Sequence, residues 1–450
     1  MAMERKFDLI VVGTGSAGSS AASVCREAGW EVAIIDSRPF GGTCALRGCD
    51  PKKVLVGGAQ LVDWNRRMQG KGVPATDLKI DWPELMKFKR TFTDPVPHQR
   101  EQEYLDAGIT PFHGRTRFLD QTSLQVGDDK LVGRFVLIAA GNKPGPLRMP
   151  GDEHVIKSDQ FLELEQMPPR VVFIGGGFIS FEFAHVAVRA GAKVHIIHRG
   201  GRPLNGFDPD LVDQLVEASR ALGIEVHLNT EPTSIAEVGD GFVVKITTGD
   251  SEHSLETDLI VHGAGRVPDI DDLDLEKCGV SRGERGVSVN EYLQSVSNPA
   301  VYAAGDSAAS GGPPLTPVAG VEGRMAAVNM LKGNHQKANY TGIPSVVFTI
   351  PPLATVGLQE DAAKQEFDVK RGETSGWYSS RRVNSKYSGY KVLIEKETNR
   401  ILGAHLFGEH AEEVINIFGL AIRYGLKAED LESMIYAYPT SASDIRYMVR

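Results

Sequence analysis

The segment FDLIVVGTGSAGSSAASVCREAG, residues 7–29, decides the fold of the first part of the chain. An apolar strand over residues 7–12 leads directly into a glycine-rich turn at 13–18, and an alanine-rich helix is expected over 19–28. Glycines in such a turn allow a tight bend and let the backbone approach a pyrophosphate at the helix N-terminus. The next apolar run, 32–35, ends at Asp36, whose carboxylate can accept hydrogen bonds from a ribose. The pattern predicts a Rossmann unit, and its predicted dinucleotide contacts are Gly13, Gly15, Ser16, Ala17, Gly18 and Asp36.

The same pattern recurs in the middle of the chain, with a strand over 171–174, glycines at 175–177, a helix through 188 and a second strand over 194–197. The spacing from the first glycine to the residue after the second strand's apolar run is 23 in both copies, 13 to 36 and 175 to 198. In the second copy, His198 and Arg199 replace the acidic residue, and a basic group would bind a 2'-phosphate that a carboxylate would repel. NADPH is therefore the preferred nicotinamide cofactor, with NADH possible, unless the arginines are merely solvated loop charges. The predicted contacts are Gly175, Gly177, Phe178, Ile179, His198, Arg199 and Arg202.

Cys44 and Cys49, separated by four residues in the segment GGTCALRGCDPKK (41–53), form the candidate redox centre. The chain has four cysteines, too few for a disulfide scaffold, so two close cysteines in a reducing compartment are expected to work chemically. Such a pair satisfies the short separation that a disulfide needs, and a helix N-terminus beside it would lower a thiolate pKa. The alternatives are a metal-binding pair or two inert thiols. Because no further cysteine or histidine ligands lie nearby in the sequence, no metal site is predicted.

Length and charge restrict the possible functions. With 450 residues, 41% of them hydrophobic, the chain is long enough for about three domains. Its net charge of -9 argues against nucleic acid or an anionic membrane surface as the main partner. The apolar run near the N-terminus is too short for a secretory signal, and no run is long enough to span a membrane. A cytoplasmic protein with a small-molecule substrate is expected.

Taken together, the paired cysteines and the two glycine motifs resemble those of the pyridine nucleotide-disulfide reductases, the flavoprotein family of glutathione reductase, dihydrolipoamide dehydrogenase and mercuric reductase. The resemblance extends almost from end to end. The further matching segments are IAAG at 138–141 and GAGRVP at 263–268, similar to interdomain hinges, VYAAGD at 301–306, LTPVA at 315–319, EGR at 322–324, and 343–358, similar to the start of a dimerisation domain.

The resemblance implies an α/β fold with two doubly wound Rossmann-type domains and a C-terminal α+β dimerisation domain in a homodimer. The expected boundaries are 1–150 for the first part of the FAD-binding domain, 151–270 for the NAD(P)H-binding domain, 271–335 for the second part of the FAD-binding domain and 336–450 for the dimerisation domain. Further FAD contacts implied by the family motifs are Gly42, Thr43, Lys53, Ala140, Gly141, Asp306, Thr316, Pro317 and Val318, and Gly265 is a further NADP contact.

The resemblance also implies the order of electron transfer. Hydride passes from NADPH to FAD and then to the Cys44–Cys49 disulfide, with Cys49 facing the flavin and Cys44 attacking the substrate. Lys53 matches a family lysine that pairs with a glutamate beside the flavin, and Glu182 matches that glutamate. A carboxylate in so apolar a segment is expected to need a charged partner.

The C-terminal segment departs from the family pattern His-Pro-Thr-x-x-Glu, whose histidine is the acid-base group that reaches across the dimer. Here Tyr438 occupies the histidine position and Ser443 the glutamate position, with Asp444 one residue later. Tyrosine has an ordinary pKa of about 10 against about 6.5 for histidine, so it can donate a proton but is a poor base. Loss of a general base removes a gain of roughly 10²- to 10⁴-fold.

Three functions remain open after this departure. The first is reduction of a small disulfide of unknown identity, with Tyr438 as a candidate proton donor. The second is reduction of a metal ion, a quinone or another electrophile; mercuric reductase also has a tyrosine near this place, but it adds a C-terminal cysteine pair that this chain does not carry. The third is a non-catalytic flavoprotein subunit of an assembly, which the joint presence of Cys44, Cys49, Lys53 and Glu182 disfavours.

Overall fold

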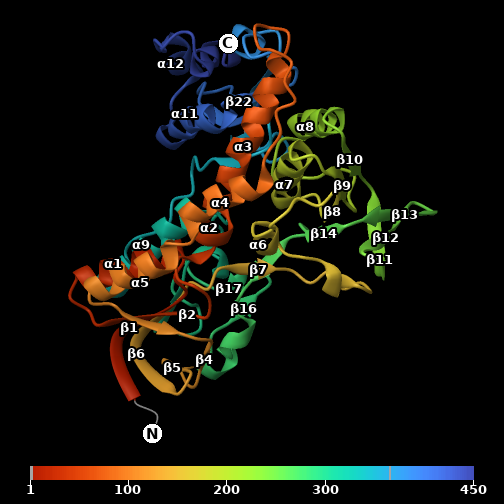
Figure 1. Ribbon diagram of the computed structural model, residues 1–450. Helices are drawn as coiled ribbons and strands as arrows, with labels where there is room; N and C mark the ends of the chain where they lie inside the picture. Colours follow the sequence, from red (N-terminus) through yellow and green to blue (C-terminus); the bar gives the residue numbers. More distant parts are fainter. Residues whose placement is uncertain (1–3, 364–365) are drawn as a thin grey trace. The chain divides into compact units, whose positions relative to one another are not determined.

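The computed structural model describes residues 4–363 and 366–450 and divides into two compact units (Figure 1). The first unit comprises the chain up to Pro51 together with Phe88–Gly145 and Gly265–Tyr340, and the second comprises Lys52–Lys87, Pro146–Ala264 and Thr341–Arg450. The division falls within two helices, α3 (Cys49–Met68) and α4 (Trp82–Thr93). Within the described residues, no helix is long and apolar enough to cross a membrane.

A seven-stranded sheet forms the centre of the first unit, in the order β3-β2-β1-β6-β5-β4 with β18 also paired to β6. Strands β1, β2, β3, β6 and β18 run parallel, whereas β4 and β5 are antiparallel additions. The strand bounds are β1 Glu4–Val12, β2 Val32–Asp36, β3 Thr110–His113, β4 Thr116–Phe118, β5 Ser123–Val126, β6 Asp129–Ile138 and β18 Val301–Ala303.

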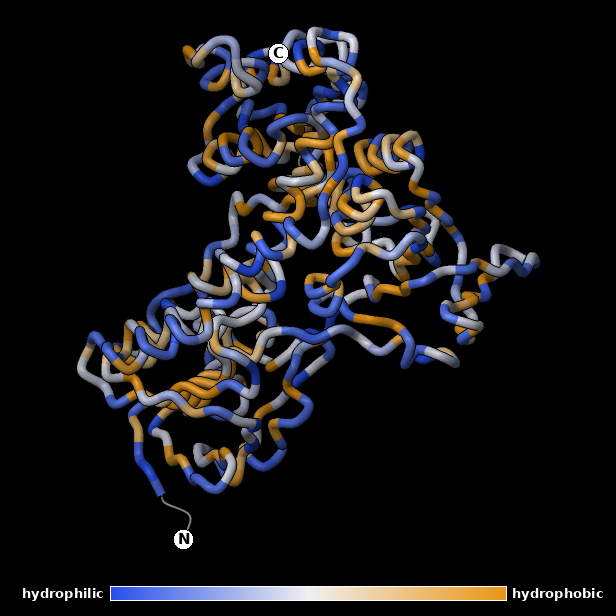
Figure 2. The backbone as a smooth tube through the Cα atoms, viewed as in Figure 1, coloured by the Kyte–Doolittle hydropathy of each residue, from blue (hydrophilic) through white to orange (hydrophobic). Residues whose placement is uncertain are grey.

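Alternation along β1 explains why this sheet is buried on both faces. Leu9 and Val11 belong to one apolar cluster and Ile10 and Val12 to another, so each face of the strand packs against its own core. Helix α1 (Ser16–Glu27) packs against α9 (Thr316–Lys332), and short helices complete the unit. In Figure 2 the hydrophobic segments of this unit are concentrated in these central strands. The remaining elements are α2 Gly42–Arg47, α5 Val96–Asp106, η2 Asp271–Leu273, η3 Leu275–Cys278, η4 Gly305–Ser307, and the strand pairs β7 Asn142–Pro144 with β15 Arg266–Pro268 and β16 Arg282–Gly283 with β17 Gly286–Val287.

The second unit contains a four-stranded parallel sheet in the order β10-β9-β8-β14. Its strands are β8 Arg170–Ile174, β9 Lys193–Ile197, β10 Ile224–His227 and β14 Leu259–His262. One face packs on helices α7 (Phe178–Arg189) and α8 (Pro209–Ala221). The other face is covered by an antiparallel meander, β11 Thr230–Val238, β12 Gly241–Thr248 and β13 Ser251–Thr257, rather than by further helices. The parallel strands of both sheets confirm the α/β class predicted from the two glycine motifs.

The C-terminal part of the second unit is a five-stranded antiparallel sheet in the order β19-β20-β23-β22-β21, packed against α11 (Ala411–Tyr424). The strands are β19 Ser345–Val347, β20 Leu353–Gly357, β21 Phe367–Glu373, β22 Gly389–Glu395 and β23 Ile401–Phe407. The short helices of this unit are η1 Asp152–His154, α6 Ser158–Phe161, α10 Tyr378–Arg381, α12 Ala428–Ser433, η5 Ser441–Asp444 and α13 Ile445–Met448. The predicted α+β architecture of this region is confirmed, whereas the four predicted domain boundaries stay predictions.

Candidate redox and nucleotide sites

Cys44 and Cys49 lie on consecutive helices, Cys44 within α2 and Cys49 at the first position of α3. Both are free thiols in this structure, and Cys49 is close enough to raise the pKa of Cys44. Cys49 Sγ also lies 3.5 Å from Thr316 Oγ1, at the start of α9. Cys49 stands at the N-terminus of the 20-residue helix α3, which is the positive end of the helix dipole. The fold thus places both sulfurs within reach of one another.

The Cys44 thiol has a distinct electrostatic setting. Its hydrogen bond with Cys49 and its burial raise its pKa, and the Asp50 carboxylate adds to the rise. Cys44 Sγ donates a weak hydrogen bond to Asp50 Oδ1 at 3.9 Å. Asp50 was not singled out by the sequence, although its position next to Cys49 could have drawn attention to it.

The expected pairing of Lys53 with Glu182 is wrong, because Lys52 makes this ion pair. Lys52 Nζ lies 2.9 Å from Glu182 Oε1, and the two side chains are only 11% and 4% exposed. The backbone N–H of Phe348 donates to the same oxygen at 2.8 Å. Neighbouring residues on a helix point about 100° apart, so only one of two adjacent lysines can face α7. Lys53 is exposed, with its Nζ 4.3 Å from the centre of the Phe348 ring.

The glycine turn after β1 has the shape that a pyrophosphate requires. Gly13 has φ of 109°, and a Cβ built there would lie 2.2 Å from the Ala139 carbonyl oxygen. A Cβ on Gly42 would lie 2.5 Å from Gly15 Cα, so the two loops approach too closely for side chains. Gly15 is the N-cap of α1, whose first N–H groups point out of the helix toward the turn. These residues fit a bound dinucleotide.

The carboxylate of Asp36, at the end of β2, already accepts hydrogen bonds from neighbouring residues of the chain. Its Oδ2 accepts hydrogen bonds from Thr14 N at 3.0 Å and Thr14 Oγ1 at 2.6 Å, and Oδ1 accepts one from Arg38 N at 3.0 Å. A carboxylate offers about four lone-pair positions, so acceptor capacity remains for a ribose hydroxyl. Thr14, which is buried, links Asp36 to the glycine turn and was missed by the sequence analysis.

Asp306 lies in η4 beside a buried carboxylate that the sequence analysis did not assign. Burial raises the pKa of Asp306, while Arg266 opposes the rise. Glu322, 1% exposed, accepts hydrogen bonds from Gly305 N at 2.7 Å, Ser310 Oγ at 2.6 Å and Tyr340 Oη at 2.5 Å. Glu322 therefore fixes the backbone next to Asp306.

The other predicted FAD contacts of this unit lie on three elements. Ala140 and Gly141 follow β6, Thr43 lies in α2, and Thr316, Pro317 and Val318 form the first turn of α9.

The second glycine turn has a similar construction. Gly175 has φ of 108°, and a Cβ there would lie 2.3 Å from the Gly263 carbonyl oxygen, while Gly177 caps α7. Phe178, 50% exposed, and Ile179 begin the helix. Gly265, also predicted as an NADP contact, belongs to the first unit.

The basic residues after β9 differ in their availability. His198 Nε2 donates to the Arg202 carbonyl oxygen at 3.0 Å, and its ring packs over Gly176. The guanidinium of Arg202 makes two hydrogen bonds of 3.1 Å to Asp213. Arg199 is exposed and makes no ion pair with the part of the chain that the structure describes. Arg199 is thus the basic side chain most available for a phosphate.

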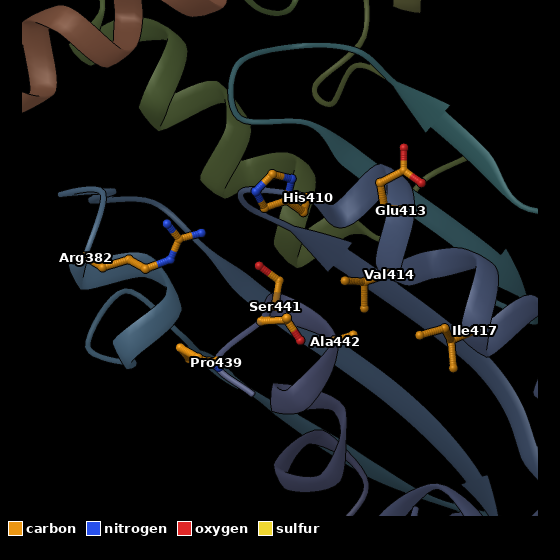
Figure 3. A pocket seen from close by; sticks show the side chains of 9 residues that line it. Arg382, His410, Glu413, Val414, Ile417, Pro439, Ser441 and Ala442 are labelled. Carbon is orange, nitrogen blue, oxygen red and sulfur yellow. The ribbon is translucent and has the colours of Figure 1, made fainter. Parts of the chain in front are cut away.

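Tyr438 is 80% exposed and precedes the 3₁₀ turn η5. Ser443 Oγ donates to the Thr440 carbonyl oxygen at 2.6 Å and so stabilises the turn. Asp444 accepts a hydrogen bond from Ser379. A cavity of about 360 Å³ lies beside this turn, with Arg382, His410 and Glu413 at its wall (Figure 3). No sequence motif pointed to these three residues.

Comparison with known proteins identifies the family. The family described as "Pyridine nucleotide-disulphide oxidoreductase" matches residues 7–323, and its dimerisation domain matches residues 343–449. The chain belongs to this family. It is 30% identical to glutathione reductase of Nostoc sp. over 97% of this chain and 98% of that protein, and 31% identical to mercuric reductase of Staphylococcus aureus over 98% of this chain and 81% of that protein. The solved structure of the Cu(II) complex of HOCl-induced flavoprotein disulfide reductase RclA from Escherichia coli superposes with a TM-score of 0.88, 25% identity and 99% coverage of each chain.

Membership of the pyridine nucleotide-disulphide oxidoreductases confirms the predicted enzyme class, an NAD(P)H-dependent flavin disulfide oxidoreductase, and the predicted cofactors, FAD and NAD(P)H. When bound, the flavin accepts a hydride from the nicotinamide and passes two electrons to a disulfide. The individual residue roles predicted from the motifs stay predictions.

Proposed function

We propose that this family member transfers electrons from NADPH, through FAD and the Cys44–Cys49 pair, to a small disulfide. The observation that carries the proposal is the placement of the two free thiols on consecutive helices, Cys44 within α2 and Cys49 at the first position of α3. Within the proposal, Cys44 and Cys49 are catalytic, and Lys52 replaces Lys53 as the partner of Glu182.

The proposed exchange consumes one dithiol for each substrate disulfide. The Cys44 thiolate attacks one substrate sulfur, which forms a mixed disulfide between Cys44 and the substrate, breaks the substrate S–S bond and releases the first thiol. The Cys49 thiolate then attacks Cys44, re-forms the Cys44–Cys49 bond and releases the second thiol. Two electrons leave the protein, and the two thiol protons end on the two products.

The raised pKa of Cys44 means that this exchange needs a proton acceptor or an alkaline medium. In the family pattern that acceptor is the C-terminal histidine, for which this chain has Tyr438. A Tyr438→His variant should therefore raise kcat for a disulfide such as lipoamide or glutathione disulfide, with Tyr438→Phe as the matched control. An unchanged kcat in Tyr438→His, with NADPH binding intact, would count against disulfides as the acceptor.

A second candidate acceptor is a metal cation. Two observations favour it: the exposed Tyr438 in place of a base, and the Asp50 carboxylate 3.9 Å from Cys44 Sγ, which attracts cations and repels anionic disulfides. Among the relatives are a mercuric reductase and a flavoprotein solved with Cu(II). NADPH oxidation measured with Cu²⁺, Hg²⁺, neutral lipoamide and anionic glutathione disulfide separates the two candidates, since only the preferred class should give turnover that depends on both cysteines.

The preference for NADPH forms part of the proposal and rests on Arg199. Its guanidinium is exposed at the end of β9, whereas Arg202 is held by Asp213. A bidentate guanidinium suits the 2'-phosphate.

A homodimer in the cytoplasm completes the proposal. The match to the dimerisation domain supports self-association. Large apolar side chains in this domain are exposed, with Tyr424 at 71% and Ile435 at 94%. Light scattering after size-exclusion chromatography should give twice the 48.8 kDa chain mass, and a monomeric mass would reject the dimer.

A further inference from the structure

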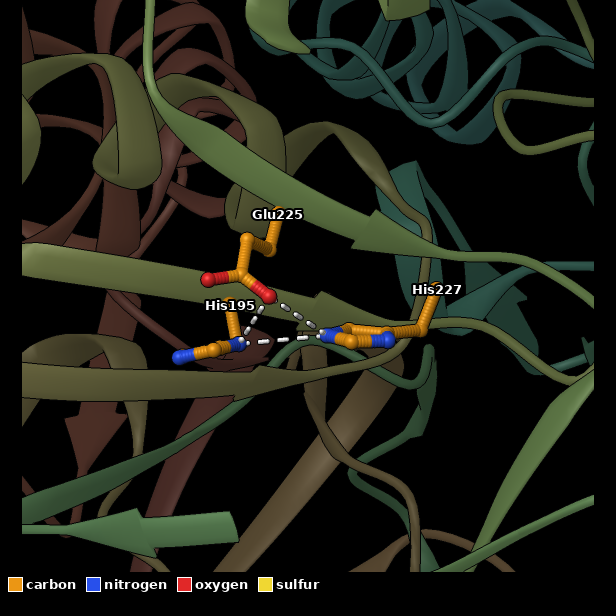
Figure 4. A group of neighbouring side chains, drawn as sticks. All are labelled: His195, Glu225 and His227. Carbon is orange, nitrogen blue, oxygen red and sulfur yellow. Dashed lines mark hydrogen bonds and ion pairs between the residues drawn. The ribbon is translucent and has the colours of Figure 1, made fainter. Parts of the chain in front are cut away.

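Three side chains of the second unit gather at the edge of its parallel sheet: His195 on β9, and Glu225 and His227 on β10 (Figure 4). His195 Nδ1 lies 3.1 Å from His227 Nε2. Glu225 Oε2 lies 3.5 Å from His195 Nδ1 and 3.9 Å from His227 Nε2. Three polar atoms therefore point toward one small volume.

The register of the two strands produces this cluster. Glu225 is paired directly with His195 in the parallel ladder, and His227, two residues further along β10, projects from the same face as Glu225. Ile197 on the same face of β9 belongs to the apolar cluster that includes the meander, whereas Val194 and Ile196 pack on the helical side. All three donors are thus held by strand backbone, on β9 and on the edge strand β10, and not by a loop.

The spacing suits a bound ion. With metal–ligand bonds of about 2.0 to 2.1 Å, two donors on one ion lie about 2.9 Å apart at a right angle and about 3.4 Å apart at the tetrahedral angle. The separations of 3.1 and 3.5 Å fall in or next to this interval, and a small rotation of Glu225, whose side chain is 67% exposed, brings the third into it. Two imidazoles and one carboxylate form a ligand set typical of Zn²⁺ and neighbouring divalent transition metals.

We propose that His195, Glu225 and His227 form a binding site for a divalent transition-metal ion, with Zn²⁺ as the reference ion, separate from the cysteine pair. The site joins β9 to the edge strand β10, and β9 ends one residue before His198 and two before Arg199. Occupancy should therefore stabilise the nucleotide-binding sheet. The proposal does not depend on which acceptor the enzyme reduces.

The test is calorimetric titration of the FAD-loaded protein with Zn²⁺ alone, in a Cys44→Ser, Cys49→Ser background that removes the thiols. One ion per chain is expected. His195→Asn and His227→Asn should each weaken binding at least roughly tenfold, and Glu225→Gln should weaken it as well. His335→Asn, an exposed histidine elsewhere, is the matched control and should bind as the background does.

Two further results decide the proposal if a variant folds poorly. Zn²⁺ should raise the thermal unfolding midpoint of the background protein and of His335→Asn, but not of His195→Asn. Cu²⁺ bound at one equivalent should show electron paramagnetic resonance couplings from two imidazole nitrogens. Zn²⁺ affinity that is unchanged in both cluster histidine variants, or the absence of a site in the background protein, would overturn the proposal.

Discussion

Substituting Lys52 with methionine should destabilise the second unit far more than the same substitution at Lys53. Lys52→Met leaves Glu182, whose side chain is 4% exposed, without its cation. Breaking a buried ion pair from one side costs about 3 to 5 kcal/mol. Because Phe348 N still donates to Glu182 at 2.8 Å, the lower end of this range, about 3 kcal/mol, is expected. At about 2 °C per kcal/mol for a unit of this size, the unfolding midpoint should fall by about 6 °C.

The matched control is Lys53→Met, which removes an exposed ammonium whose Nζ lies 4.3 Å from the centre of the Phe348 ring. Its cost should stay at or below about 1 kcal/mol, the value of an exposed cation–π contact. The assay is thermal unfolding of the FAD-loaded protein by circular dichroism at one fixed scan rate. A second control, Lys52→Met with Glu182→Leu, should recover most of the loss because it removes the unpaired carboxylate. Equal shifts for the two single variants, or a larger one for Lys53→Met, would refute the assignment of the pair to Lys52.

Three other predictions concern the cysteine pair, the first glycine turn and the basic residues after β9. Asp50→Asn should lower the pKa of Cys44, since the carboxylate helps to raise it, so the rise of disulfide reduction with pH should move to lower pH; an unmoved profile would show that Asp50 does not act on Cys44. Gly42→Val should abolish FAD retention, measured by the flavin absorbance ratio of the purified protein, because its side chain would meet Gly15 Cα, whereas full retention in that variant would contradict the predicted cradle. Arg199→Glu should raise KM for NADPH more than for NADH and more than Arg202→Glu does, and equal effects on both cofactors would argue against a 2'-phosphate contact.

The sequence predicted what local pattern determines. Both glycine turns, the helix N-termini behind them and the cysteine pair follow from residues close together in the chain, so their positions could be predicted in advance. The buried Glu182 was also predicted to need a cation, but the choice between two adjacent lysines depends on which face of α3 is turned toward α7. The rotation of α3 about its axis depends on tertiary packing, and the motif alone does not indicate it.

Contacts between distant segments escaped prediction for the same reason. Thr14 and Asp36 meet because β1 and β2 pair in register, and Glu322 reaches Gly305 and Tyr340 from the buried face of α9. His195 and His227 are 32 residues apart and meet only through the pairing of β9 with β10. No spacing rule in the sequence indicates which histidines become neighbours in this way.

The central claim is that NADPH reduces the Cys44–Cys49 pair by way of the flavin. The most direct measurement is an anaerobic titration with NADPH followed by absorbance, with NADH in parallel and Cys49→Ser as control. After two electrons, a long-wavelength band from a thiolate beside the flavin should appear, and Cys49→Ser should lack it. Bleaching of the flavin with no such band in the unmodified protein would contradict the account and show that electrons bypass the cysteines.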